Sequence, residues 1–137
     1  MLFPTLSTAQ SGLNVFRTWM DAVSDNIANI DDAAPTSGPA YQARFVVASP
    51  VGNGTQASAG NPAGATVSGI TLGDPAGRQV SDPTNPLADA KGMVRYPDID
   101  LGEQMTQMMM AQRGYEANLS VIDRAKDAYQ QALSIGR

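Results

Sequence analysis

The sequence predicts a mainly α-helical protein in which two long helices, one near each end, flank a small β-rich insert. Apolar residues recur at alternating steps of three and four over residues 5–30 and again over 101–135, a spacing typical of helices that pack on other helices. Residues 36–97 instead hold most of the Gly and Pro and several short runs of strand-forming residues. We therefore divide the chain into parts 1–35, 36–97 and 98–137.

The first predicted helix covers residues 5–30 and has an apolar residue at every position of its repeat. Thr5 or Ser7 is predicted as its N-cap, and Gly12 is interpreted as a point of close helix contact. The Asp- and Pro-rich run 31–39 ends the helix. The repeat consists of Leu6, Ala9, Leu13, Phe16, Met20, Val23, Ile27 and Ile30.

The insert is expected to form short strands joined by Gly- and Pro-rich connections. Residues 41–48 and 65–72 have strand composition, and 79–81 is a candidate for a third short strand. Residues 52–64 are small, polar and Gly-rich, which predicts a mobile loop or hairpin tip. Residues 92–97 are expected to lead in extended form into the second helix.

The second predicted helix runs from residue 101 to 135, which corresponds to a rod of about 50 Å at about 1.5 Å per residue. Asp100 is its predicted N-cap, Glu103 would complete a capping box, and Gly136 stands where a helix commonly ends. The repeat consists of Leu101, Met105, Met108, Gln112, Tyr115, Leu119, Ile122, Lys126, Tyr129 and Leu133.

Composition excludes several classes of function. The 137 residues contain neither Cys nor His, so nucleophile–His catalysis, thiolate or His-ligated zinc and haem ligation are excluded. A net charge of −4 argues against nucleic acid as a partner, and no apolar run is long enough to span a membrane. We expect no catalytic residue, metal, cofactor or small-molecule substrate; the acidic residues 98–103 fit helix capping better than calcium binding.

Both helices carry more apolar surface than so small an insert can cover. The simplest way to bury that surface is to pack the helices against each other and against neighbouring copies. Any one of these residues is explained equally well as intramolecular core or as an intersubunit contact. The candidate assembly interface consists of Leu6, Leu13, Phe16, Met20, Val23, Ile27, Met105, Met108, Tyr115, Leu119, Ile122, Tyr129 and Leu133.

Two short motifs stand in the two predicted helices. They consist of Ser11, Gly12, Leu13, Asn26, Ile27, Ala28 and Asn29 in the first and of Arg113, Tyr115, Ala117 and Asn118 in the second. Together they resemble the signatures of the rod, hook and hook-associated axial proteins of the bacterial flagellum. In such a motif Asn26 and Asn29 are interpreted as hydrogen-bonding residues that fix a helix end or a neighbouring backbone.

The short insert resembles that of the proximal-rod members of this family, as do residues 82–98 that precede the second helix. The turn at 30–41 is longer than the family's usual Thr-Pro-Gly-Tyr type, which leaves its local geometry open. The alternatives are another short axial protein of the same apparatus, or a soluble helical export chaperone.

The resemblance implies a structural subunit of the proximal rod, with the two helices forming an antiparallel coiled coil. Copies would stack into a hollow drive shaft that transmits torque and surrounds the export channel. Expected partners are copies of the chain itself, the other proximal-rod proteins, the adaptor protein at the rod base and the distal-rod protein. The resemblance also implies a place in the basal body outside the cytoplasmic membrane, reached by type III export without a cleaved signal peptide.

Overall fold

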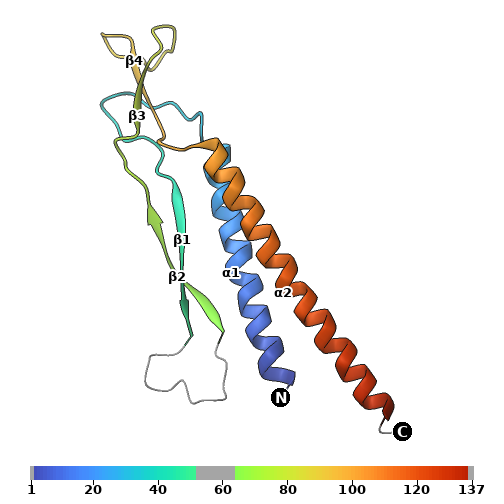
Figure 1. Ribbon diagram of the computed structural model, residues 1–137. Helices are drawn as coiled ribbons and strands as arrows, with labels where there is room; N and C mark the ends of the chain where they lie inside the picture. Colours follow the sequence, from blue (N-terminus) through green and yellow to red (C-terminus); the bar gives the residue numbers. More distant parts are fainter. Residues whose placement is uncertain (1, 52–63, 136–137) are drawn as a thin grey trace.

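The computed structural model describes residues 2–51 and 64–135, which form two long helices and four short strands (Figure 1). The order is α1 (Leu2–Ala28), β1 (Arg44–Pro50), β2 (Ala65–Leu72), β3 (Arg78–Ser81), β4 (Met93–Tyr96) and α2 (Leu101–Ile135). The predicted class, mainly helical with a small β-rich insert, is confirmed. The predicted loop 52–64, apart from Gly64, and the predicted terminator Gly136 lie outside the described residues.

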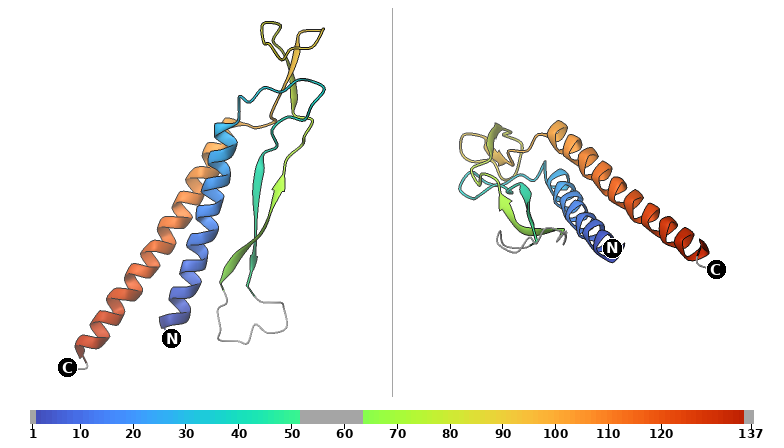
Figure 2. Two further views of the ribbon diagram at one scale, coloured as in Figure 1. Left: turned by 180° about the vertical axis from the view of Figure 1, so that it is seen from behind. Right: turned by 60° about the horizontal axis from the view of Figure 1, so that its bottom comes forward.

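The two helices lie side by side and run in opposite directions, and they diverge toward the end that holds both termini (Figures 1 and 2). α1 begins at Leu2, so Thr5 and Ser7 lie inside it and the prediction that either is the N-cap is wrong. α2 begins as predicted, because Asp100 Oδ1 accepts the Glu103 amide at 2.7 Å. The capping box is not completed, since the Glu103 carboxylate accepts the Gln107 side-chain amide instead.

Strands β1 and β2 form an antiparallel hairpin that lies along α1. β2 has the predicted bounds, whereas β1 begins three residues later than expected, at Arg44. The pairing shifts between Val47 and Ala48, so that Ser68 is an extra residue in β2. This hairpin and α2 contact two different sides of α1.

Strands β3 and β4 form a second antiparallel pair beyond the end of α1, and the extended residues predicted at 92–97 supply β4. Ala34 and Arg95 exchange two backbone hydrogen bonds of 2.8 and 2.9 Å, and the Arg95 Nη1 donates to the Gly38 carbonyl at 2.9 Å. These bonds fasten the turn that follows α1 to β4, and thereby fix where the chain enters α2.

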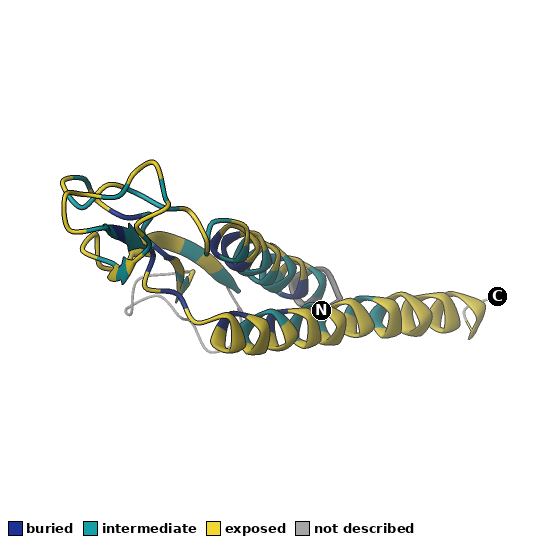
Figure 3. Ribbon diagram, turned by 90° about the horizontal axis from the view of Figure 1, so that it is seen from above, coloured by how far each residue is buried: buried dark blue, intermediate teal, exposed yellow. Residues whose placement is uncertain are grey.

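The buried core is small and lies where α1, α2 and the strands meet (Figure 3). Val23, Val94 and Ala111 are completely buried. The half of α2 nearer its C-terminal end is almost entirely exposed. Neither described helix carries an 18-residue window apolar enough to cross a membrane.

Candidate assembly interface

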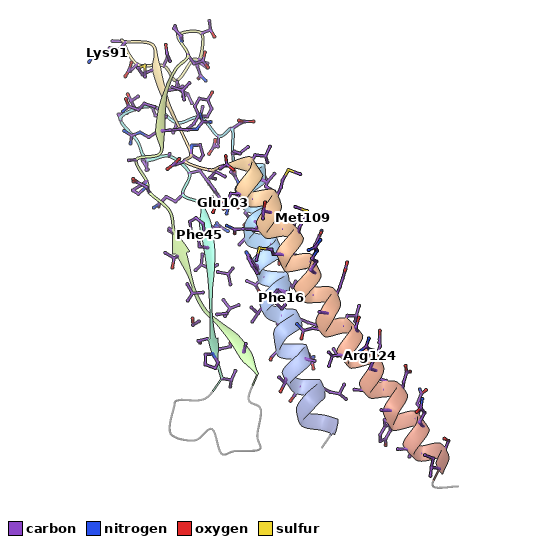
Figure 4. All side chains as sticks on the ribbon, in the orientation of Figure 1. Phe16, Phe45, Lys91, Glu103, Met109 and Arg124 are labelled. Carbon is purple, nitrogen blue, oxygen red and sulfur yellow. The ribbon has the colours of Figure 1, made fainter. Side chains whose placement is uncertain are left out.

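The two helices are in close contact at two glycines. A Cβ on Gly12 would lie 2.9 Å from the Asn118 amide nitrogen, and a Cβ on Gly114 would collide with the Phe16 ring. The pairs are reciprocal, because each helix supplies one glycine and one larger side chain. Figure 4 shows Phe16 on α1 at this contact. A side chain at either glycine would have to displace the opposite residue, Asn118 or Phe16, so glycine suits both positions.

The side of α2 that faces α1 is built from small and amide residues. Ala111 and Gln104 are buried, and Gly114 and Asn118 are half-buried. Met108, Tyr115 and Ile122 flank this row and are half-buried as well. Helix packing is therefore centred one residue away from the apolar repeat identified in the sequence, because close approach favours small side chains at the contact line.

Asn26 joins three elements through its buried side-chain amide. Its Nδ2 donates to the Gln104 Oε1 at 2.9 Å and to the Arg44 carbonyl at 3.0 Å, and its Oδ1 accepts the Arg44 amide at 2.7 Å. Asn26 is 0% exposed and Gln104 2%. Burial of the two side-chain amides is tolerated because Asn26 hydrogen-bonds Gln104 and also the backbone of Arg44, at the start of β1.

The other motif residues divide into two groups. The Ser11 hydroxyl accepts the Ala65 amide at 3.0 Å, which holds the start of β2 on α1. Asn29 Nδ2 donates to the Asp25 carbonyl at 2.7 Å and stabilises the end of α1. Leu13 and Ile27 are half-buried, whereas Ala28, Arg113 and Ala117 are exposed. Ser11 and Asn29 thus fix local structure through hydrogen bonds, whereas the exposed motif residues can face solvent or a neighbouring subunit.

The apolar repeat of α1 is covered and that of α2 is not. The seven repeat positions within α1 and the eighth, Ile30, in the turn beyond it, are buried or half-buried. On α2, Met108, Tyr115 and Ile122 are half-buried, while the other members of the predicted repeat are exposed. Met109 lies on the side of α2 away from α1 (Figure 4). The exposed large apolar residues of α2 are Leu101, Met105, Met109, Met110, Leu119, Val121, Tyr129, Leu133 and Ile135.

The hairpin has apolar residues on both faces. Val46 and Ala48 face α1, where they line an open groove of about 320 Å³ together with Val15, Phe16 and Trp19. Phe45 and Val47 alternate with them and therefore point away from α1. Phe45 (Figure 4) is 39% exposed and Val47 is 44% exposed. The hairpin thus leaves its outer apolar surface uncovered.

Among the described residues, Tyr41 and Asp89 have shifted pKa values. Burial raises the pKa of Tyr41, whose hydroxyl lies 3.5 Å from Asn26 Oδ1. The backbone amides of Met93 and Lys91 lower the pKa of the exposed Asp89 carboxyl. Across 2–51 and 64–135, no three acidic residues come together as metal ligands would. What the described geometry offers is surface for packing.

Sequence reasoning assigned no role to Gln104 or Ala111, and it gave no interpretation of Gly114, which lies within the second motif. Their signal was present: Gln104, Gln107, Ala111, Gly114 and Asn118 also alternate by three and four residues. This second repeat consists of small and amide residues, and it runs beside the apolar one. A search for apolar periodicity passes over it, although Trp19 Nε1 and Asn26 bond across to it at 3.4 and 2.9 Å.

Two family models match the chain, and both matches centre on the helices described above. "Flagella basal body rod protein" matches residues 6–32, which include nearly all of α1 and the turn that follows. "Flagellar basal body rod FlgEFG protein C-terminal" matches residues 90–135, which include β4 and α2. The two matches therefore contain the two reciprocal glycines and the Asn26–Gln104 pair.

Similar proteins match over nearly the whole chain. The flagellar basal-body rod protein FlgC of Yersinia enterocolitica is 33% identical over 94% of this chain and 93% of its own length. FlgC of Bacillus subtilis is 33% identical over 98% of both chains. FlgC of Escherichia coli O6:H1 is 32% identical over 94% of this chain and 93% of its own.

Proposed function

Because the chain belongs to the FlgC family of flagellar basal-body rod proteins and is a structural subunit of the rod, we propose that it builds the proximal part of that rod. In this role copies assemble, together with the other proximal-rod proteins, into a hollow shaft that surrounds the export channel and transmits torque. The rod-base adaptor and the distal rod are its neighbours along the axis. The role requires no catalytic residue and no cofactor.

The helices form an antiparallel coiled coil in this proposal. Two contacts support it, because each helix places a side chain over a glycine of the other: Asn118 over Gly12, and Phe16 over Gly114. The unbroken alternation of three and four residues on α1 supports it as well. A long pair locked at several levels resists bending and twisting, because many contacts would have to slide together.

The observation that carries the assembly role is the row of exposed apolar residues along α2. Leu101, Met105 and Leu119 are each more than two-fifths exposed on a helix otherwise suited to packing. Full burial of such a side chain is favourable by roughly 1.5 to 3 kcal/mol relative to leaving it exposed to water. We therefore assign the exposed members of the candidate assembly interface to contacts between subunits, and the buried ones, such as Val23, to the subunit core.

The proposed location is the basal body outside the cytoplasmic membrane, reached through the flagellar type III apparatus without removal of a signal peptide. A density map of the assembled basal body tests the location. Copies should appear in the rod segment nearest the cytoplasmic membrane, around the channel. Finding the chain only in the segment next to the hook would overturn the proximal assignment.

A substitution tests the assembly role. Leu119→Asp should prevent rod assembly and abolish swimming, because it places a charge in the proposed contact. Ser120→Asp, at the exposed neighbouring position, is the matched control and should leave swimming intact. Normal rods in the Leu119→Asp strain would contradict the assignment of this row.

A further inference from the structure

One side of the helix pair is apolar and only partly covered, with half-buried residues on α1 and exposed residues on α2. The hairpin contacts the flank of α1 that holds Ser11, Val15 and Thr18. At 3.6 residues per turn, the opposite flank holds Leu13, Met20 and Ile27, all half-buried. Because this flank lies opposite the hairpin, its partial burial comes from α2, and part of each of these side chains stays exposed.

The matching flank of α2 follows from its contacts. Trp19 bonds Gln107 and Phe16 meets Gly114, so the Gln107 and Gly114 side of α2 is the side nearer the hairpin groove. Leu101, Met105 and Leu119 project from the other flank. In an antiparallel pair these two flanks lie on the same side. We call the combined surface the open helix face: Leu13, Met20, Ile27, Leu101, Met105 and Leu119.

A second apolar surface lies on the far side of the hairpin. Phe45 and Val47 point away from α1, and their partners in β2 are Thr71 and Gly69. A Cβ on Gly69 would meet open space, so this surface is shallow and unobstructed. We call these four residues the outer hairpin face. The only charged residue in either strand is Arg44, which pairs with Asp25 at 2.8 Å.

The two surfaces face opposite directions and cannot meet within one copy, because α1 and the hairpin lie between them. We propose that the outer hairpin face of one copy packs on the open helix face of the next copy. The inference rests on the proposed rod function and adds the partner and the two surfaces. Each copy then offers one surface to each neighbour, a head-to-tail contact that extends around or along an assembly instead of stopping at a dimer.

Four features favour a second copy as the occupant. The two surfaces match in length: β1 spans about 20 Å, and Met105 to Leu119 also spans about 20 Å. The residues that define the two surfaces are all uncharged, and the exposed Glu116 lies beside Met105 and Leu119 on the same flank of α2. A two-stranded hairpin is marginal alone, and covering its outer face stabilises it in the assembly. Met20 and Met105 adapt readily to a flat strand surface.

The chain contains no Cys, so an introduced pair reports a single contact. We would build Val47→Cys with Met105→Cys and oxidise basal bodies isolated from cells that express it. The expected result is a ladder of disulfide-linked dimers and larger species. Val47→Cys with Met110→Cys is the matched control, because Met105 and Met110 are 55% and 57% exposed on opposite flanks of α2. The control should remain monomeric.

Each outcome decides the question. Equal ladders from both pairs, or no ladder from the Met105 pair in basal bodies that contain the protein, would overturn the proposed contact while leaving the rod function in place. Absence of the chain from basal bodies would instead refute the rod function. If the double variant does not assemble, the Val47→Cys and Met105→Cys single variants are co-expressed with each other, and a disulfide between one chain of each kind is sought by mass spectrometry. Its absence from assembled rods counts against the proposal.

Discussion

α1 and α2 have similar apolar repeats in the sequence but opposite surroundings in the structure. The repeat of α1 is covered, and its exposed stripe is polar, with Ser7, Gln10, Arg17 and Asp21. α2 contacts α1 through small and amide residues, and it leaves much of its apolar repeat in solvent. The first helix is thus a core element of the subunit, whereas the second is held in place by one side and presents another outward.

The difference teaches that apolar periodicity identifies a packing surface without identifying its partner. For α1 the partners are α2 and the hairpin of the same chain. For α2 the described residues supply a partner only for the side that faces α1, which holds Gln104, Ala111, Gly114 and Asn118. Substitutions should therefore separate into those that unfold the subunit and those that leave it folded but unable to assemble.

Asn26→Ala should have the largest effect on folding. It leaves the Arg44 amide and the Gln104 side chain without partners, and we expect the free energy of unfolding to fall by about 3 kcal/mol. Urea unfolding followed by circular dichroism measures this. Asn29→Ala, which removes a single more exposed bond at the end of α1, is the control and should cost well under half as much. Equal losses would mean that Asn26 is not the junction of the three elements.

Gly114→Val should destabilise the helix pair by about 2 kcal/mol, because the new side chain collides with the Phe16 ring. Ser120→Val, on the exposed side of the same helix, introduces the same β-branched residue without this collision. The two variants are compared by thermal unfolding. If they are equally stable, α2 is not held against α1 through its small residues.

Met105→Ser should leave the isolated chain within about 0.5 kcal/mol of its original stability, because the side chain is exposed there. Swimming in soft agar should nevertheless be reduced or lost. Gln10→Ser, on the exposed stripe of α1, should alter neither property. A Gln10→Ser strain as defective as the Met105→Ser strain would break the contrast between the helices.

Acid should have the smallest effect, and only at the β3–β4 end. Asp89 accepts the Lys91 and Met93 amides, so its folded pKa lies below its unfolded value. Its contribution is therefore complete above the usual Asp pKa of about 4 and is lost as pH falls through the lower folded value. Amide chemical shifts of Lys91 and Met93 should report this loss, and Asp89→Asn should abolish it.

Meanwhile the α1–α2 contact should resist acid, since glycines and the uncharged amides of Asn26, Gln104 and Asn118 form much of it. Loss of helix content at the same pH as the Asp89 transition would contradict this separation.

Much of the fold could be predicted from local pattern. The 4–3 repeats located both helices, the Asp100 cap placed the start of α2 correctly, and alternating β-branched residues gave the bounds of β2. The early start of α1 at Leu2 was missed, because Thr5 and Ser7 resemble caps and nothing local shows that the helix already continues through them.

The candidate site was predictable in outline only. The motifs contained Asn26 and both members of the Gly12–Asn118 pair, but not Gln104, the partner of Asn26, or Phe16, the partner of Gly114. Such pairings join residues about 80 to 110 positions apart, and no short-range pattern encodes them.

The sequence by itself determined two long amphipathic helices, a small β insert and a surplus of apolar surface, because these follow from side-chain periodicity and chemistry. Only the tertiary structure decided which repeat is buried. Two helices pack closely where their side chains are small, and so Gln104, Gly114 and Asn118 of α2 face α1 while Leu101, Met105 and Leu119 are exposed.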